Sequence, residues 1–330
     1  MRVMVTGGAG YVGSVSVERL LEAGHDVLVV DDLTTGHRAA VPDGARLVRG
    51  SFLDMDAIGR AMEEHATEAV LHCAAKSLVG ESIAEPATYY RSNVVGGLVL
   101  LETMRRLAVR RMVFSSTAAV YGTPDVVPIT EDAPLRPINP YGETKRTFEG
   151  ALGWYGSAYG LRSVCLRYFN VAGASRLNGE VHDPETHLIP NILAAAAGGP
   201  ALSLFGNDYP TPDGTCIRDY IHVQDLAEAH LLALEATAPG DPRTERQLVC
   251  NLGNGGGFSV RQVLETAEAV VGQPIPHTIG PRRAGDPAVL VASAAKAESI
   301  LGWRPVRPTL EEMIGSAWAW RHRNPGGYAE

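Results

Sequence analysis

Short apolar runs alternate with longer amphipathic segments through the first half of the chain. Short runs of mostly aliphatic residues predict buried strands, and segments with apolar residues at helical spacing predict helices between them. The predicted strands cover residues 3–6, 27–30, 69–73, 112–115 and 164–167. The predicted helices cover residues 12–23, 54–65, 86–107 and 140–159. The alternation predicts an α/β fold, a doubly wound parallel sheet covered by helices on both faces. In such a sheet the binding crevice lies beyond the carboxyl ends of the strands.

The second half of the chain changes character, because Gly, Asn, Asp and Pro interrupt it at turn positions. Residues 173–190 and 205–215 are predicted to be rich in loops. Further helices are predicted at 187–197, 223–235, 259–271, 293–301 and 310–321.

Composition and charge narrow the classes of function. Hydrophobic residues make up 45% of the chain and charged residues 20%, which predicts a packed globular core. The net charge of -8 argues against nucleic acid as the main partner, since binding to phosphate backbones needs a concentrated basic surface. The four cysteines are scattered without zinc-binding spacing, so we expect reduced thiols and no metal centre. No apolar run approaches the roughly 18 residues of a bilayer span and no secretory signal is evident, so we expect a cytoplasmic protein without a membrane partner.

Three glycines, Gly7, Gly10 and Gly13, follow the first predicted strand and open the first predicted helix. This spacing permits a tight turn, close approach of the backbone to a pyrophosphate, and close helix–strand packing. Asp31 ends the next strand, where a carboxylate accepts hydrogen bonds from the adenosine ribose and repels a 2′-phosphate. The pattern predicts an NAD site rather than an NADP site. The structural alternatives are an ordinary glycine turn and a turn or cap role for Asp31.

Tyr141 and Lys145 stand four residues apart in a predicted helix, so both side chains share one face. A phenol with an ordinary pKa of about 10 is a weak base at neutral pH, but a nearby ammonium group and a positively charged nicotinamide ring both favour the phenolate. Thr117 follows a strand, and its hydroxyl can donate to the same substrate oxygen and relay a proton to Tyr141. The three residues predict proton transfer coupled to hydride transfer to NAD. The alternatives are chance spacing on an exposed helix and a polar residue that only ends a strand.

The glycine turn, Thr117 and the Tyr141/Lys145 pair together resemble the extended short-chain dehydrogenase/reductase superfamily, and within it the UDP-glucose 4-epimerases. The resemblance extends over nearly the whole chain through dispersed segments. These segments are residues 72–75, 79–82, 92–94, 166–170, 205–211, 218–222, 251–253 and 282–286.

The resemblance implies a Rossmann-like NAD-binding domain over residues 1–170 and a smaller UDP-sugar lobe, mainly 171–330. The lobes would interleave, with the chain returning to the first domain around 216–236. The implied NAD-site residues are Gly7, Gly10, Tyr11, Val12, Gly13, Asp31, Asp32, Leu33, Thr34, Thr35, Gly36, Ser51, Phe52, Cys73, Ala74, Ala75, Lys76, Asn93, Thr117, Tyr141, Lys145, Tyr168 and Phe169. The implied UDP-sugar residues are Thr117, Tyr141, Asn170, Leu188, Phe205, Arg218, Tyr220, Arg283, Asp286 and Leu290.

The activity implied is the interconversion of UDP-galactose and UDP-glucose through a 4-keto sugar, with Tyr141, Lys145 and Thr117 as catalytic residues. A homodimer through helices that include residues 86–107 is also implied. Three positions depart from the family pattern. Thr117 stands where Ser is also common, and it keeps the hydroxyl that the chemistry needs. Ser51 stands where an acidic residue commonly contacts adenine, and Leu290 stands where some members carry a bulkier Tyr, so N-acetylated sugars become candidate substrates.

Other activities remain open at this point. A sugar-nucleotide dehydratase would need an acidic pair directly after the hydroxyl residue, where this chain has Ala118 and Ala119. The remaining alternatives are an epimerase for other UDP-sugars, such as UDP-pentoses or uronates, a net oxidoreductase, and an NAD-binding protein without catalytic activity.

Overall fold

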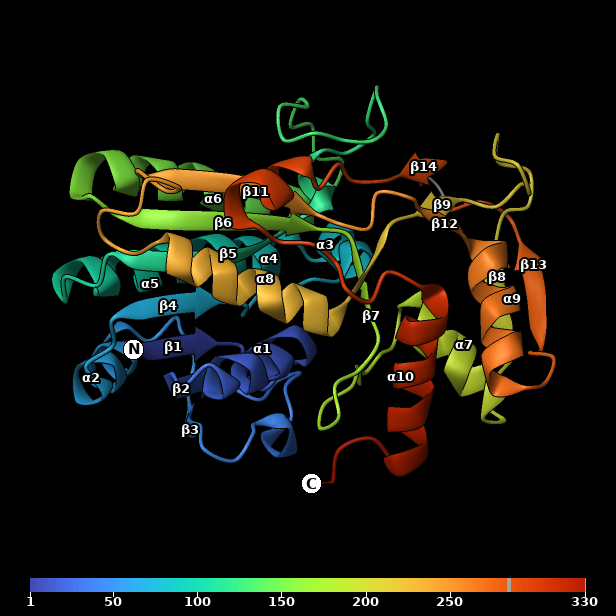
Figure 1. The fold of residues 1–330 in the computed structure, drawn as a ribbon, viewed down its shortest axis with the longest axis horizontal. Helices are drawn as coiled ribbons and strands as arrows, with labels where there is room; N and C mark the ends of the chain where they lie inside the picture. The colour runs from blue at the N-terminus through green and yellow to red at the C-terminus, as the bar shows by residue number, and fades with distance from the viewer. Residues whose placement is uncertain (284–285, 330) are drawn as a thin grey trace.

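A parallel β-sheet forms the centre of the larger lobe in the computed structural model, which describes residues 1–283 and 286–329. Within these residues its strand order is β11-β6-β5-β4-β1-β2-β3 (Figure 1). The strands are β1 (Arg2–Thr6), β2 (Asp26–Asp31), β3 (Arg46–Arg49), β4 (Ala69–His72), β5 (Arg111–Thr117), β6 (Arg162–Tyr168) and β11 (Gln247–Leu252). The chain moves outward from β1 to β3 and then crosses back to β4 on the other side of β1. This reversal creates the switch point at which ligands bind in such sheets.

Helices cover both faces of the sheet, which confirms the predicted fold class. One face is covered by α1 (Tyr11–Glu22) and α8 (Val223–Ala236), which lie side by side in Figure 1, and by the π-helical turn η4 (Ala297–Leu301). The other face is covered by α2 (Met55–His65), α5 (Gly97–Arg106) and α6 (Pro140–Tyr159). Their apolar side chains pack onto alternating strand residues in two separate cores, as expected for a sheet buried on both sides.

The helix at α6 has the predicted bounds, and its ends explain why. The Asn139 side chain accepts a hydrogen bond from the amide of Gly142 at 2.9 Å, and Pro140 occupies the first helical position. Gly160 ends the helix in a left-handed conformation. These local signals fix the helix on which Tyr141 and Lys145 lie.

The helix predicted at 86–107 is instead three helical segments that follow one another. They are α4 (Pro86–Tyr89), the π-helical segment η2 (Tyr90–Gly96) and α5. A Cβ on Gly96 would lie 2.4 Å from the Phe52 ring, so the segment packs too closely there for any side chain. Asn93 lies buried in the π-helical segment, a form of helix found frequently at functional sites. Apolar periodicity does not reveal such a local change in helix type.

The smaller lobe joins helices to short strands around a third core, at the right of Figure 1. Its helices are α7 (Leu188–Ala196), α9 (Val260–Val271) and α10 (Leu310–Arg323). Its strands are β8 (Leu202–Phe205) with β13 (His277–Gly280), and β12 (Phe258–Ser259), β9 (Ile217–Arg218) and β14 (Val289–Leu290). A further pair, β7 (Asn170–Ala172) with β10 (Tyr220–His222), lies where the chain passes between the lobes. The remaining short helices are α3 (Val79–Ala84), η1 (Arg38–Ala40) and η3 (Ala118–Val120).

The chain returns to the larger lobe over a longer stretch than residues 216–236. The α8 helix lies in that range, but β11 adds a further strand beside β6, and η4 packs against α8. The sequence prediction did not assign β3 or β11 as strands of the sheet. Both lie at its edges, where Arg46, Arg49 and Gln247 interrupt the apolar pattern.

No helix within the described residues is both long enough and apolar enough to cross a membrane.

Candidate active site

The glycine turn lies between β1 and α1 at the switch point of the sheet. Gly7 has a φ of +72°, and a Cβ there would lie 2.6 Å from the amide nitrogen of Ala74. A Cβ on Gly13 would lie 2.0 Å from the carbonyl oxygen of Gly7. Any larger residue at these positions would force the turn apart. The glycines are therefore required by the close approach of strand, turn and helix.

The first turn of α1 faces the same place with unused amide groups. Gly10 is the N-cap, and in the described part of the chain no side chain caps the helix. The free amides and the helix dipole make this end suitable for an anionic group such as a pyrophosphate. Tyr11 donates from its hydroxyl to the carbonyl oxygen of Gly173 at 2.6 Å, so the first turn is also tied to the second lobe.

Asp31 ends β2 with its carboxylate turned toward the glycine turn. One oxygen accepts from the amide of Ala9 at 3.0 Å and the other from the amide of Leu33 at 2.9 Å. Burial raises the pKa of Asp31, and these two hydrogen bonds oppose that rise. Each carboxylate oxygen keeps a second acceptor position for a ribose hydroxyl.

The other residues predicted to border the adenosine half of the cofactor form a separate turn. Asp32 accepts from the amide and the hydroxyl of Thr34, which closes the loop that leads through Thr35 to Gly36. The Ser51 hydroxyl accepts from the Leu53 amide at 3.2 Å.

A clamp orders the chain after β4, where Cys73, Ala74, Ala75 and Lys76 were predicted to line the cofactor site. The Asn93 side chain accepts from the Lys76 amide at 2.9 Å and donates to the Lys76 carbonyl at 3.0 Å. It also donates to the Thr144 hydroxyl in α6 at 3.0 Å. The buried Asn93 side chain therefore fixes the loop after β4 to the helix that carries Tyr141.

Lys145 is 3% exposed and lies against the end of β5. Its Nζ donates to the carbonyl oxygen of Ser115 at 2.7 Å and lies 5.9 Å from the centre of the Tyr141 ring. Burial lowers the pKa of Lys145 to about 8. The helical spacing of four residues thus brings Lys145 and Tyr141 to one place, as the sequence predicted.

Thr117 completes the group from the last residue of β5. Its hydroxyl accepts from the Ala119 amide at 3.1 Å, and it lies close enough to the Tyr141 side chain to lower the pKa of that phenol. Burial has the larger effect and raises the pKa of Tyr141. From the sequence, the Lys145 ammonium and the nicotinamide cation are the groups expected to favour the phenolate, and burial of Tyr141 opposes both.

The end of β6 brings two aromatic residues to the same edge of the sheet. Tyr168 is the last residue of β6, and its pKa is raised by burial. Phe169 packs with Tyr121 in a small apolar cluster that also contains Leu290 of the second lobe. The cluster joins the segment that follows Thr117 to the second lobe.

Several residues predicted to bind the UDP-sugar gather in the second lobe. Arg218 in β9 pairs with the Asp286 carboxylate, and Leu290 is the register partner of Arg218 in the neighbouring strand β14. The Arg283 guanidinium lies 4.1 Å from the centre of the Phe205 ring, which is partly exposed. Two of the predicted cationic residues and a partly exposed aromatic ring therefore lie in this lobe, a combination suited to a diphosphate and a base. Ala284 and Gly285, also part of the resembling segment, lie outside the described residues.

The remaining predicted substrate residues lie where the lobes meet. Asn170 pairs in register with Tyr220 in the β7/β10 ladder, and Leu188 is the first residue of α7. Tyr220 is buried in the core of the second lobe, next to the Phe258 ring, and burial raises its pKa.

This arrangement of glycine turn, terminal carboxylate and Tyr/Lys helix agrees with a family model. The model describes the "NAD dependent epimerase/dehydratase family" and matches residues 3–253. The chain belongs to this family.

Individual proteins of this kind are similar to the chain over nearly its full length. A protein of Streptomyces lividans described as a UDP-glucose 4-epimerase is 53% identical over 329 residues, which cover 99% of this chain and 98% of the relative. The crystal structure of UDP-glucose 4-epimerase from Brucella ovis in complex with NAD is 45% identical, with a TM-score of 0.93 over 97% of this chain and 98% of that one. The UDP-glucose 4-epimerase of Bifidobacterium longum, in complex with NAD+ and UDP, is 38% identical, with a TM-score of 0.93 over 99% of this chain and 100% of that one.

Two buried carboxylates, those of Glu149 and Asp219, hold the site in place and were not predicted from the sequence. Glu149 in α6 pairs with Arg167 of β6 at 3.0 Å and accepts from the Ser116 hydroxyl, all beneath the end of β5. The Asp219 carboxylate accepts from the amides of Ala292, Asn254 and Gly255, which fixes the strand that carries Arg218. Helical spacing between Lys145 and Glu149 was the available signal for the first. For the second, only an acidic residue beside Arg218 was visible.

Proposed function

We propose that this chain interconverts UDP-galactose and UDP-glucose by oxidation and reduction at C4 of the sugar, with NAD as cofactor. The observation that supports this most directly is the meeting of Tyr141, Lys145 and Thr117 at the end of β5, at the same edge of the sheet as the glycine turn after β1. A hydroxyl relay, a phenol and a buried ammonium group are the parts needed to remove and return a hydroxyl proton.

The residues at the switch point fit NAD. Gly7 and Gly13 leave no room for a side chain, and the free amides of α1 suit the pyrophosphate. The Asp31 carboxylate suits the two ribose hydroxyls and opposes the extra phosphate of NADP. Bound NAD supplies the hydride acceptor and donor of the reaction. The other residues proposed to hold it are those named from the sequence along β2, β4, the π-helical segment and β6.

Tyr141 is the proposed base for the O4 proton of the sugar. Because burial raises the pKa of Tyr141, the nearby Thr117 side chain and added positive charge must favour the phenolate. Lys145 contributes one charge, and the oxidised nicotinamide ring is a second cation that we expect beside the phenol. Thr117 holds O4 in line with Tyr141 and passes the proton between them. The residues after Thr117 are Ala118 and Ala119, which offer no acid for the loss of water.

The UDP part is proposed to remain fixed while the sugar turns. Arg218 and Arg283 would hold the diphosphate oxygens, and Phe205 would lie against the uracil. Asp286, which pairs with Arg218, would fix that guanidinium in its fork-like geometry. Asn170, Leu188 and Tyr220 would border the same pocket at the junction of the lobes.

Product analysis after incubation with UDP-galactose and no added cofactor tests the proposal. Epimerisation regenerates the cofactor, so we expect UDP-glucose to accumulate to equilibrium without net NADH. Conversion only with stoichiometric NAD would instead identify a dehydrogenase. No conversion by protein that carries NAD would identify a binding protein and refute the proposal.

Leu290 favours a wider sugar range. It lies beside Arg218 in the strand ladder and packs in the cluster that contains Phe169. Since a bulkier Tyr there would restrict the pocket, we propose that UDP-GlcNAc is also accepted. We expect Leu290→Tyr to reduce turnover of UDP-GlcNAc while it leaves turnover of UDP-galactose within about twofold. Good turnover of UDP-galactose with none of UDP-GlcNAc by the unaltered protein would refute this wider range.

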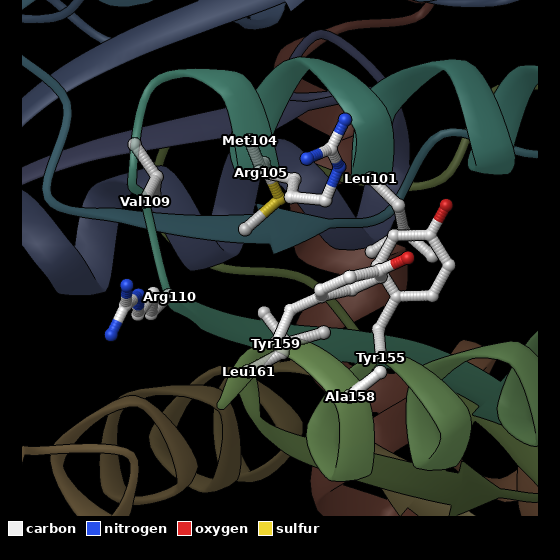
Figure 2. Close-up of a pocket in the computed structure, with 9 residues that line it drawn as sticks. All are labelled: Leu101, Met104, Arg105, Val109, Arg110, Tyr155, Ala158, Tyr159 and Leu161. Carbon is white, nitrogen blue, oxygen red and sulfur yellow. The ribbon is translucent and has the colours of Figure 1, made fainter.

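We also propose a homodimer and a cytoplasmic location. Apolar side chains are exposed along the outer surface of η2, α5 and α6, among them Val95, Leu98 and Trp154. A surface cavity of about 360 Å³ lies between α5 and α6 at Tyr155, Tyr159 and Arg105, and contains none of the predicted site residues (Figure 2). Such a surface is suited to a second copy of the chain. The four unpaired thiols suit a reducing compartment.

A further inference from the structure

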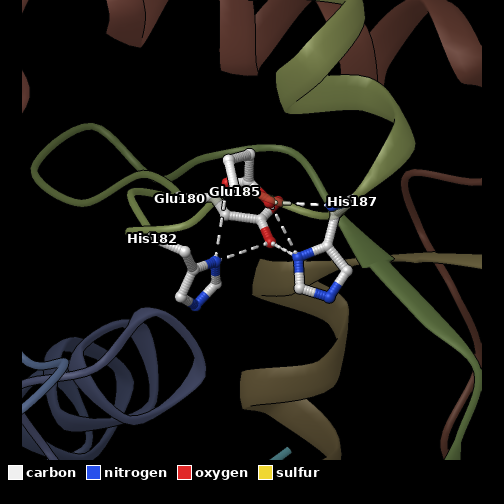
Figure 3. Close-up of side chains that lie close together, drawn as sticks. All are labelled: Glu180, His182, Glu185 and His187. Carbon is white, nitrogen blue, oxygen red and sulfur yellow. Dashed lines mark hydrogen bonds and ion pairs between the residues drawn. The ribbon is translucent and has the colours of Figure 1, made fainter. Parts of the chain in front are cut away.

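Four side chains from one short loop converge just before α7. Figure 3 shows Glu180, His182, Glu185 and His187 directed toward a common point. One oxygen or nitrogen from each lies within 4.8 Å of those of the others. They follow the pattern E-x-H-x-x-E-x-H within eight residues. The scattered cysteines of the chain, without zinc-binding spacing, predicted no metal centre, and none of these four residues belongs to the predicted cofactor or substrate sites.

The distances between the donor atoms suit a small four-coordinate ion. The His187 Nδ1 lies 2.8 Å from the nearer Glu180 oxygen and 3.1 Å from one of Glu185. The His182 Nδ1 lies 3.4 Å from the same Glu180 oxygen, Oε1, and 3.6 Å from the other Glu185 oxygen, Oε2. A tetrahedral zinc ion with bonds of about 2.0–2.1 Å places neighbouring ligand atoms about 3.3 Å apart. The four separations given above, 2.8–3.6 Å, lie on both sides of this value.

The carboxylates are largely withdrawn from solvent and one is held by the backbone. Their side chains are 8% exposed for Glu180 and 19% for Glu185. One Glu185 oxygen accepts from the amides of Thr186 and His187, each at 2.8 Å, and these two hydrogen bonds hold the carboxylate in a fixed orientation. The Nδ1 atom of His182 is buried without a hydrogen-bond partner of good geometry among the described residues, although it faces both carboxylates.

Charge also points to a cation at this place. Two partly buried carboxylates are costly unless positive charge balances them. One divalent ion bound by the four side chains would balance the charge of both carboxylates. Imidazole and carboxylate ligands in a closed four-ligand cage suit Zn²⁺ better than Mg²⁺ or Ca²⁺, which require six or more oxygen ligands.

We propose that Glu180, His182, Glu185 and His187 form a structural binding site for a divalent transition-metal ion of the zinc type. The site would stiffen the loop that joins the lobes. That loop contacts the first lobe through Asn178, which donates to Glu18 at 2.7 Å, and ends at His187 directly before α7. A bound ion would fix the start of α7, where Leu188 lies, relative to the first lobe.

The proposal is tested by metal binding to the full chain, without use of enzymatic activity. After treatment with a chelator and its removal, the protein is titrated with ZnCl2 by calorimetry and with CoCl2 by visible absorption. We expect one ion per chain, the intense visible bands of tetrahedral Co²⁺, and a higher midpoint of thermal unfolding with Zn²⁺ but not with MgCl2. The variants His182→Asn and Glu185→Gln should each weaken Zn²⁺ binding at least tenfold, whereas His322→Ala, an exposed histidine in α10, should bind like the unaltered protein.

Two results would overturn the site. One is the absence of stoichiometric Zn²⁺ or Co²⁺ binding at micromolar concentration by the unaltered protein. The other is binding that persists unchanged in both variants, which would place the ion elsewhere. Because the Co²⁺ spectrum reports the ligand geometry of the unaltered protein directly, a variant that fails to fold leaves this measurement intact.

Discussion

Tyr141 is the residue on which the proposed proton transfer depends. Its hydroxyl is the only part that Tyr141→Phe removes, so we expect the variant to fold and to retain NAD. Turnover of UDP-galactose should fall by about 10²–10⁴-fold, the usual contribution of a positioned acid or base. Steady-state rates and the NAD content of the purified protein provide the measurement. The control is Tyr159→Phe, near the end of the same helix and half exposed, which should keep normal rates. Near-normal turnover by Tyr141→Phe would remove this residue as the base.

Three buried histidines contribute to the way in which stability responds to acid, and burial lowers the pKa of one of them, His222, to about 4. Burial lowers the pKa of both His72 and His230 to about 3. Between pH 3 and the unfolded pKa of about 6.5, the unfolded chain binds more protons, so stability falls as the pH decreases. Each histidine contributes a slope of up to about 1.4 kcal/mol per pH unit.

Urea unfolding at pH 6.0 and pH 5.0, at one protein concentration, measures this slope. The variant His230→Gln keeps a donor and an acceptor near Ser16 and Ser115 but does not titrate. We expect its free energy of unfolding to change less between the two pH values than that of the unaltered protein, by up to about 1.4 kcal/mol. An equal change in both proteins would show that His230 is not held neutral by burial.

At the scale of the elements, the junction of β1 and α1 has the least tolerance for change. A methyl group at Gly13 would clash with the Gly7 carbonyl oxygen. To remove this clash, the glycine turn would have to leave its position against the Ala74 backbone. We expect Gly13→Ala to lose bound NAD and to be less stable by several kcal/mol, in the range of overpacked buried sites. NAD content and thermal unfolding measure both effects.

Gly150 in α6 supplies the matched control, because a Cβ there meets no atom within 4 Å. Replacement of a helical glycine by alanine in open space stabilises by about 0.5–1 kcal/mol. Gly150→Ala should therefore raise the unfolding midpoint and keep full NAD content. If both variants lost NAD to a similar extent, the loss would not be due to the close contact at Gly13, and the prediction would be wrong.

At the scale of the whole molecule, the exposed apolar surface of η2, α5 and α6 is the feature that a single chain leaves unexplained. Trp154 is 78% exposed there. We expect the double variant Leu98→Glu/Trp154→Glu to convert the proposed dimer into a monomer, because two charges per chain would enter an apolar contact. Light scattering after size-exclusion chromatography gives the mass. Val306→Glu, at an exposed apolar residue preceding α10, should remain dimeric. A monomeric unaltered protein would refute the dimer.

The sequence alone determined the elements whose cause is local. The helix at 140–159 was predicted at its observed bounds because Asn139, Pro140 and Gly160 are capping signals that act over a few residues. The glycine turn and the shared face of Tyr141 and Lys145 were predictable for the same reason, since covalent geometry and helix periodicity depend only on neighbours in the chain. The resemblance of dispersed segments then supplied the family and the expected chemistry.

Tertiary structure decided what depends on distant contacts. The edge strands β3 and β11 exist because neighbouring strands pair with them, and the π-helical segment at Asn93 packs against Phe52 and Thr144. The raised pKa of Tyr141 is a consequence of burial, which a list of residues does not contain. The charged groups of the 180–187 loop are close in sequence, yet their convergence depends on how the loop is folded between the two lobes. Local geometry is fixed by the chain itself, whereas burial and long-range pairing exist only after the chain has folded.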